Sequence, residues 1–156
     1  MPKPTPEPTP EPTPVPTRHD IRRATTVDQL VAAGPLFDSP TRAEWAERFL
    51  SAAGHHLFLA YADGRPVGFV TGIEMLHPDK GVEMCLYELA VAEPYRRRGI
   101  ASALIGTLAA LCEELGCYDM WVGVDLDNMG ALATYRATGA VGAGGCAVLT
   151  WEFRAP

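Results

Sequence analysis

The middle of the chain, from residue 82 to Gly116, constrains the fold more than any other part. It begins with a run of strand-forming residues at 82–91 and continues with leucines at helical spacing until Gly116. A turn containing three adjacent arginines lies between the two. A second apolar run follows at 121–124. This order of strand, helix and strand predicts a crossover between two strands of one sheet.

The rest of the pattern extends this unit to a mixed α/β domain. The turn Asp63-Gly64-Arg65-Pro66 predicts a hairpin. Thr26, Thr41 and Asn128 are the expected N-caps of three helices. We expect those helices at 26–33, 41–52 and 128–139, and further strands at 21–24, 56–62, 67–75 and 148–153.

The first residues differ in composition from everything that follows. Residues 1–17 alternate proline with threonine and glutamate, which predicts an extended, polyproline-like tail without a core of its own. Such a tail is either a flexible leader or a docking segment for a proline-binding module. Because no aromatic or basic flank accompanies it, we favour the leader. We therefore expect a tail at 1–19 and a folded domain at 20–156.

Composition narrows the class of protein. A chain of 156 residues that is 47% hydrophobic suits one domain with a substantial core. No apolar run approaches the roughly 20 residues of a membrane helix, and prolines fill the place of a signal peptide's apolar region. We therefore expect a cytoplasmic protein without a membrane partner. The net charge of −6 argues against nucleic acid and is compatible with a cationic substrate.

The cysteines and histidines predict no metal site. Four of each are present, but their spacing shows no pair typical of zinc ligands or of a disulfide framework. Cys85 and Cys112 lie among apolar residues and are expected in the core. His55 and His56 open a predicted strand, where a structural or exposed role is expected.

The arginine-rich turn is the strongest candidate for a binding site. A helix N-terminus presents unpaired amides and a partial positive charge, both of which favour a phosphate group. Gly99 and Ala101 leave the backbone open to close approach, and Ser102 adds a hydroxyl. The neighbouring arginines add charge and forked donors. The alternative is a solvated basic turn whose residues merely cap the helix.

The residues around this turn resemble a known family. The stretch from Leu89 through Arg96-x-x-Gly99-x-Ala101 resembles the acetyl-CoA-binding signature of the GNAT N-acetyltransferase superfamily. Asn128, Ala131, Tyr135 and Gly139 resemble its second cofactor motif, and the likeness covers about residues 20–154. It implies a GNAT fold, with about six or seven strands in a mixed sheet splayed in the middle and about four flanking helices. It also implies acetyl-CoA as co-substrate, no metal, and a homodimer as one common assembly.

The resemblance assigns the cofactor contacts. The pantetheine arm would insert beside the splayed strand and bond the backbone of Leu89 and Val91, with the Leu89 amide facing the thioester carbonyl. Tyr135 would protonate the departing thiolate, since a phenol with a pKa of about 10 is protonated at neutral pH. The alternative for Tyr135 is packing on the sheet. The implied cofactor-binding residues are Leu89, Ala90, Val91, Arg96, Arg97, Arg98, Gly99, Ile100, Ala101, Ser102, Asn128 and Tyr135.

An attacking amine must be neutral, so a carboxylate is expected to accept its proton. Glu83 and Glu88 lie on one predicted strand, and strict alternation places them on opposite faces. A β-bulge, common in this strand of the family, would change that register and bring both to one cleft. Glu88 is the first choice as base and Glu83 the second. The alternatives are an exposed edge carboxylate for Glu88 and a solvent-facing strand residue for Glu83.

The acceptor is inferred from a narrower likeness. Residues 87–91, Tyr-Glu-Leu-Ala-Val, resemble the Tyr-Asp-Leu-Ala-Val stretch of GNAT-type aminoglycoside 3-N-acetyltransferases. Glu83 matches an acid of those enzymes, and Asp125 falls where they carry an aspartate. The likeness implies a small cationic amine, an aminoglycoside antibiotic, that Glu83, Glu88 and Asp125 bind and that attacks acetyl-CoA directly in a ternary complex.

The chain departs from that pattern at two places. Glu88 replaces the shorter aspartate, and Asn128 and Met129 stand where those enzymes carry acids. Two other readings therefore remain open. One is acetylation of a protein N-terminus, a lysine or a polyamine, and the other is a non-catalytic acetyl-CoA-binding module.

Overall fold

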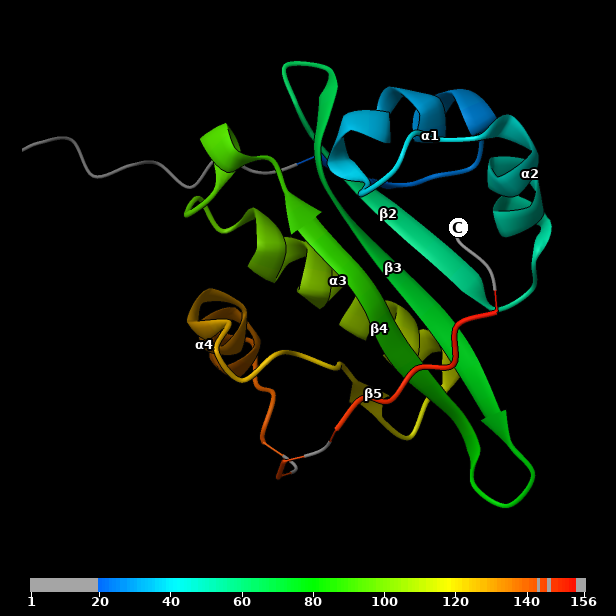
Figure 1. The fold of residues 1–156 in the computed structure, drawn as a ribbon, viewed down its shortest axis with the longest axis vertical. Helices are drawn as coiled ribbons and strands as arrows, with labels where there is room; N and C mark the ends of the chain where they lie inside the picture. The colour runs from blue at the N-terminus through cyan, green and yellow to red at the C-terminus, as the bar shows by residue number, and fades with distance from the viewer. Residues whose placement is uncertain (1–19, 143, 146, 154–156) are drawn as a thin grey trace, which may run out of the picture. The chain divides into compact units, whose positions relative to one another are not determined.

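The computed structural model describes residues 20–142, 144–145 and 147–153 (Figure 1). The chain divides into two compact units, the first ending at Gly123 and the second beginning at Val124, and each is described by itself. The predicted proline-rich tail, residues 1–19, lies outside the described residues.

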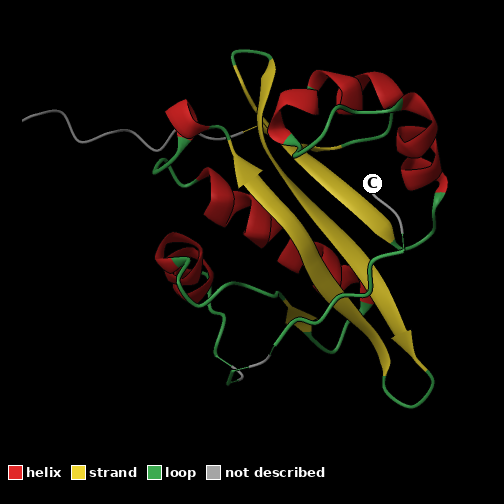
Figure 2. Cartoon of the chain, in the orientation of Figure 1, coloured by secondary structure: helices red, strands yellow, loops and turns green. Residues whose placement is uncertain are grey.

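The first unit is built on a single mixed sheet (Figure 2). The first four strands pair antiparallel with their sequence neighbours, whereas the fifth lies parallel to the fourth after a helical crossover. The predicted crossover and the mixed α/β class are confirmed. In sheet order the strands are β1 (Asp20–Arg23), β2 (His55–Ala62), β3 (Arg65–His77), β4 (Gly81–Val91) and β5 (Met120–Trp121).

The helices follow the predicted order. In chain order the described residues form α1 (Val27–Ala32), α2 (Ala43–Ser51), α3 (Ile100–Leu115) and α4 (Met129–Ala137), with short 3-10 helices at Gly34–Leu36 and Glu93–Tyr95.

Two of the three predicted N-caps are confirmed. The Thr26 hydroxyl accepts the Gln29 N–H at 3.3 Å, and the Gln29 side chain accepts the Thr26 N–H at 3.1 Å, which forms a capping box. Asn128 Oδ1 accepts an amide at the start of α4. The prediction for Thr41 is wrong: Arg42 is the N-cap of α2, because the Thr41 hydroxyl instead donates to the Leu30 carbonyl at 3.2 Å. That bond ties the α2 entry to α1.

The two faces of the sheet carry different layers (Figure 1). On one face α3 lies so close to β3 that a Cβ added at Gly72 would fall 2.6 Å from Leu108 Cδ1. On the other face β2 and β3 contribute apolar side chains to a core cluster with α1 and α2. There the rings of Phe37 and Phe69 meet edge to face, with centroids 4.7 Å apart. The sheet is therefore buried on both faces in its centre.

The two cysteines predicted in the core and one histidine are buried. Cys85 and Cys112 are buried as predicted, and burial raises the pKa of the Cys112 thiol to about 12. His56 is buried near the start of β2, where Nε2 bonds Glu74 Oε1 at 2.7 Å and Nδ1 faces the Arg23 guanidinium. Among the described residues, none of the helices has the length and apolar content of a membrane span.

The strand count is lower than predicted. Residues 148–153 form no strand, and β5 ends at Trp121 instead of continuing to residue 124. Alternating apolar side chains indicate that a segment is suited to a strand. A strand forms, however, only where a neighbouring strand is available for hydrogen bonding. Residues 148–153 have no such neighbour within the described chain. The sheet accordingly has five described strands, against about six or seven predicted.

The close contact of α3 with β3 at Gly72 should make this position sensitive to an added methyl group. We expect Gly72→Ala to lower the free energy of unfolding by about 1–3 kcal/mol, because the new methyl group overpacks the interface with Leu108. Urea denaturation measures the effect. The matched control is Gly106→Ala on α3, where an added Cβ would meet nothing within 4 Å. It should raise stability by up to about 1 kcal/mol, since alanine is the better helix former. Wild-type stability in Gly72→Ala would contradict the close packing.

Candidate functional site

A β-bulge interrupts β4 in the segment where the candidate base lies. Thr71 of β3 faces Glu88, and the next residue, Gly72, faces Leu86, so Tyr87 is an extra residue on β4. The Glu88 N–H donates to the Thr71 hydroxyl at 2.9 Å. The bulge that the family resemblance anticipated is thus present.

The bulge decides which face each carboxylate occupies. Directly paired residues of neighbouring strands project to the same face. Glu88 faces Thr71 and Glu83 faces Met75, and these two β3 residues lie four positions apart, on one face. Strict alternation, which predicted opposite faces, is therefore wrong for this pair, because the extra residue shifts the phase. Both carboxylates belong to the face that carries α1 and α2.

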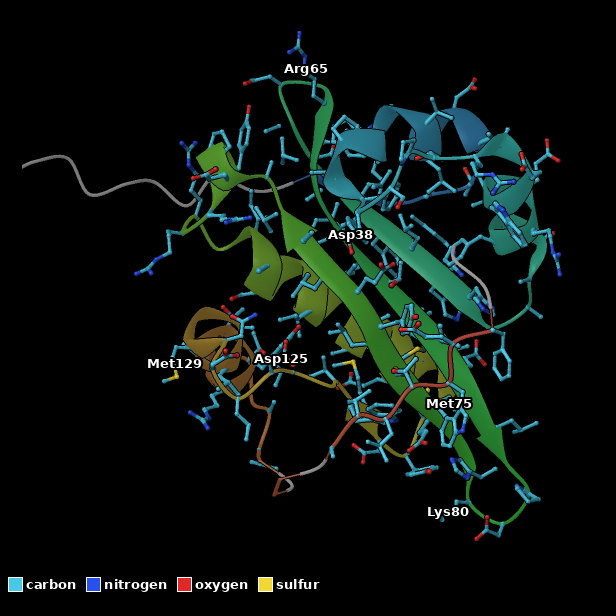
Figure 3. The ribbon with its side chains drawn as sticks, viewed as in Figure 1. Asp38, Arg65, Met75, Lys80, Asp125 and Met129 are labelled. Carbon is cyan, nitrogen blue, oxygen red and sulfur yellow. The ribbon has the colours of Figure 1, made fainter. Side chains whose placement is uncertain are left out.

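Glu88 lies in surroundings that suit a base. Although the residue is solvent-accessible, partial burial of its carboxyl raises its pKa above the ordinary value, and the negative charge of Asp38 raises that pKa further. Asp38 lies on the connection between α1 and α2, directly after Phe37, whose ring packs on Phe69 of the same sheet face (Figure 3). A carboxylate with a raised pKa is a stronger proton acceptor than an ordinary one.

Glu83 is held in a different way. Its Oε1 bonds His77 Nε2 at 2.8 Å, and its Oε2 accepts the Tyr118 hydroxyl at 3.0 Å. The bond from His77, with a smaller contribution from Tyr118, lowers the pKa of the Glu83 carboxyl. Both oxygens therefore have partners, and the group is a weaker base than Glu88.

The outer edge of β4 is open beside Glu88. The Ala92 N–H donates to the Val67 carbonyl of β3 at 2.8 Å. Because amides along a strand point alternately to its two edges, the Val91 and Leu89 N–H groups point away from β3. On that edge β5 pairs with β4 at Met84 and Cys85. Among the described residues, no strand pairs with β4 at Leu89 and Val91, so this edge is open.

The turn before α3 presents its backbone to solvent. Arg97 and Gly99 adopt left-handed φ angles of 63° and 80°, and Gly99 is the N-cap of the 16-residue α3. No side chain of the described chain caps this helix start, and a Cβ added at Gly99 would meet nothing within 4 Å. The first-turn amides are therefore accessible, next to exposed arginines. This donor set fits a diphosphate.

The turn's side chains have separate roles. Arg96 Nε donates to the Val91 carbonyl at 2.9 Å, which ties the turn to the end of β4. The Arg98 guanidinium lies 5.4 Å from the centroid of the Tyr95 ring. The Ile100 side chain is buried in the core, so its backbone alone can face a ligand. Ala101 and Ser102 follow in the first turn of α3.

The remaining predicted site residues belong to the second unit. Asn128 Oδ1 accepts the Ala131 N–H at 3.1 Å, which is a capping bond. The Asp125 carbonyl accepts the Asn128 N–H at 3.0 Å, in the turn that leads into α4. Tyr135 lies on α4, and burial raises the pKa of its phenol, which keeps it protonated at neutral pH.

Two residues of the site were missed from the sequence. Thr71 is a buried polar residue in the apolar stretch 67–73 of β3, and that contrast was the available signal. Asp38 lies in an irregular connection, and its position beside Glu88 depends on the packing of Phe37, so the sequence carried no signal for it. Among the described residues, no group of three or more His, Cys, Asp or Glu side chains is arranged to hold a metal ion.

The comparison with known families agrees with this geometry. Residues 19–140 match the model of the acetyltransferase (GNAT) family. The chain belongs to the GNAT acetyltransferase family. The open strand edge and the uncapped helix start therefore lie within the matched GNAT region.

The chain is similar to N-acetyltransferases of different kinds. The chain is 29% identical to N-acetyltransferase 8 of Rattus norvegicus over 112 residues, which are 70% of this chain and 50% of the relative. It is 34% identical to the N-alpha-acetyltransferase MAK3 of Arabidopsis thaliana over 84 residues, 54% of this chain and 44% of that protein. The chain thus spans half or less of the length of these relatives.

A solved structure shares the GNAT fold. An aminoglycoside acetyltransferase from an uncultured soil metagenomic sample, in complex with sisomicin, superposes with a TM-score of 0.80. The superposition covers 87% of this chain and 97% of the other at 20% sequence identity. At this identity the likeness establishes the fold alone.

The accessible turn makes a binding prediction with a matched control. Gly99 and Gly116 are the left-handed glycines at the two ends of α3, and an added Cβ meets nothing within 4 Å at either. Alanine at each should cost about 1 kcal/mol of stability, since L-residues disfavour that conformation. Gly99→Ala should also weaken coenzyme A binding by about tenfold, the equivalent of one bond to a charged group. Gly116→Ala should bind coenzyme A normally.

Calorimetric titration with coenzyme A measures both variants. Equal affinity in Gly99→Ala and Gly116→Ala would contradict a diphosphate site at the start of α3.

Proposed function

We propose that this chain is an acetyl-CoA-dependent N-acetyltransferase that acetylates an amine of a cationic small molecule. The observation that carries the proposal is the arrangement at the β4 bulge. There a carboxylate of raised pKa, Glu88, directly precedes the Leu89 amide, which points to an open strand edge. A proton acceptor and a hydrogen-bond donor for a developing oxyanion thus lie on consecutive residues.

The cofactor would lie along the backbone from β4 to α3. The diphosphate would accept bonds from the amides of residues 99–102, with the exposed arginines of the turn adding positive charge. The pantetheine arm would pair with Leu89 and Val91 at the open edge of β4. Ile100 would contribute through its backbone and Ser102 through its hydroxyl, whereas the Ala90 amide, by the alternation along β4, points toward β3 and away from this edge. Asn128, by its family position, would contact the cofactor from the α4 entry.

The transfer would be direct, in a ternary complex. The acceptor nitrogen attacks the thioester carbonyl carbon, and Glu88 receives the proton that the nitrogen loses. The Leu89 N–H stabilises the oxyanion. The C–S bond then breaks and Tyr135, protonated at neutral pH, gives its proton to the leaving thiolate. Glu83, with its lowered pKa, would hold an acceptor ammonium instead of removing a proton.

The acceptor would be a compound with several ammonium groups. Glu88 and Asp38 are acidic groups near each other on one face, and the whole chain carries a net charge of −6. Such a field attracts polycations to the site. The complex of the metagenomic acetyltransferase with sisomicin supports an aminoglycoside as acceptor, and the 3-amine as the position of acetylation rests on the likeness of residues 87–91 alone. Asp125 would add a further negative charge.

A second candidate acceptor is a peptide N-terminus, a lysine or a polyamine. The 34% identity with an N-alpha-acetyltransferase over 84 residues favours it. A peptide acceptor needs an extended groove that binds its backbone. An aminoglycoside acceptor instead needs a cluster of carboxylates that binds its ammonium groups. The third candidate is a module that binds acetyl-CoA without turnover. Such a module needs no general base, so it does not account for the raised pKa of Glu88.

An acceptor panel tests the proposal. With acetyl-CoA, the protein should release free thiol when mixed with aminoglycosides, and proton NMR of the product should show acetylation at the 3-amine. Polyamines and peptides of matched concentration serve as the comparison. Turnover with peptides alone would contradict the antibiotic acceptor. Acetyl-CoA binding without turnover on any amine would contradict the transferase.

The base assignment makes a kinetic prediction. Glu88→Gln should lower kcat by about 10²–10⁴-fold, the usual contribution of a general base, while coenzyme A affinity stays unchanged. Asp38→Asn should move the acidic limb of the pH profile to lower pH, because loss of a negative neighbour lowers the pKa of Glu88. Asp63→Asn, in the β2–β3 turn, is the matched control and should leave the limb in place. Full activity in Glu88→Gln would exclude this residue as the base.

A further inference from the structure

Thr71 is an unusual residue for the centre of a packed sheet. The residue is 3% exposed, and within the described chain Thr71 and His56 are the buried polar residues. The Thr71 hydroxyl accepts the Glu88 N–H at 2.9 Å. In a regular antiparallel ladder a backbone carbonyl would accept that amide. At the bulge the Thr71 side chain supplies an acceptor for it.

This bond stabilises the bulge. A bulge leaves its extra residue, here Tyr87, unpaired and disrupts the ladder beside it, and a part-buried amide that loses an acceptor costs about 1–3 kcal/mol. Without an acceptor at this point, a ladder that omits the bulge becomes competitive. A slip of one residue would turn every side chain from Glu88 to Val91 to the opposite face. It would also turn the Leu89 amide toward β3.

We propose that Thr71 is a positioning residue for acetyl transfer: its hydroxyl holds the Glu88 amide and thereby keeps the bulge that sets Glu88 and the Leu89 N–H in their working orientations. The inference rests on the proposed function for its kinetic consequence. Thr71 acts through β4 and contacts neither the cofactor nor the acceptor in this scheme. Its role is to fix the phase of the strand segment that does.

The hydroxyl can be separated from the packing of the side chain. Thr71→Val keeps the shape and the preference for strands but removes the acceptor, whereas Thr71→Ser keeps the hydroxyl and loses a methyl group. If Thr71 serves packing alone, valine is the milder change. If its hydroxyl holds the bulge, serine is the milder change. The two substitutions therefore give opposite rankings.

Kinetics and amide exchange test the inference together. Thr71→Val should lower kcat by about 5–150-fold, which corresponds to a buried amide left without its acceptor, while Thr71→Ser should stay within about threefold of wild type. Hydrogen exchange of the Glu88 amide, resolved by NMR, should accelerate by a similar factor in Thr71→Val and remain slow in Thr71→Ser. The matched control is Thr107→Val on α3, whose hydroxyl donates to the Ala103 carbonyl at 3.0 Å; neither quantity should change there.

The outcomes separate this inference from the proposed function. Wild-type kcat in Thr71→Val, or equal losses in the valine and serine variants, would overturn the positioning role. If wild type acetylates no amine at all, the proposed function fails, and unchanged exchange of the Glu88 amide in Thr71→Val would then overturn the bulge assignment independently. Should the valine variant fail to fold by circular dichroism, Thr71→Cys, a weak acceptor, replaces it and is expected between valine and serine.

Discussion

The hydrogen bond between the Glu88 amide and the Thr71 hydroxyl is the interaction on which the rest of the site depends. It accommodates one extra residue in β4, and that residue changes the phase of the strand after it. Because of this change Glu88 shares a face with Glu83 and with the α1–α2 layer. The same change sends the Leu89 and Val91 amides to the edge of β4 that faces away from β3. A local irregularity of the backbone thus sets both the carboxylate and the amide donors.

The second feature of the site, the start of α3, also acts through backbone amides. The uncapped start of α3 offers amides to an anion, and Arg96 ties this turn to the end of β4 through the Val91 carbonyl. Backbone donors place few demands on side-chain identity beyond glycine at a left-handed position. This is consistent with a TM-score of 0.80 to a solved aminoglycoside acetyltransferase at 20% sequence identity. Side chains such as Glu88 and Asp38 would then distinguish the acceptors.

Local signals made much of the fold predictable from the sequence. The crossover, the length of α3 and the caps at Thr26 and Asn128 depend on residues close together in the chain, and the structure confirms them. The partner of the Thr41 hydroxyl, the acid beside Glu88 and the absence of a strand at 148–153 depend on contacts between distant segments. Composition and periodicity do not report such contacts. The bulge in β4 was only partly predictable. The family resemblance suggested it, whereas the alternation of residues along the strand gave no sign of it.

A crystal structure with bound coenzyme A tests the central claim most directly. We predict that the pantetheine amides pair with Leu89 and Val91 at the open edge of β4, and that the diphosphate lies on the amides around Gly99. The bulge at Tyr87 should persist, with the Glu88 carboxylate facing the thiol. Coenzyme A bound elsewhere, or a regular β4 ladder in which Leu89 faces β3, would contradict the claim that the backbone of this strand builds the site.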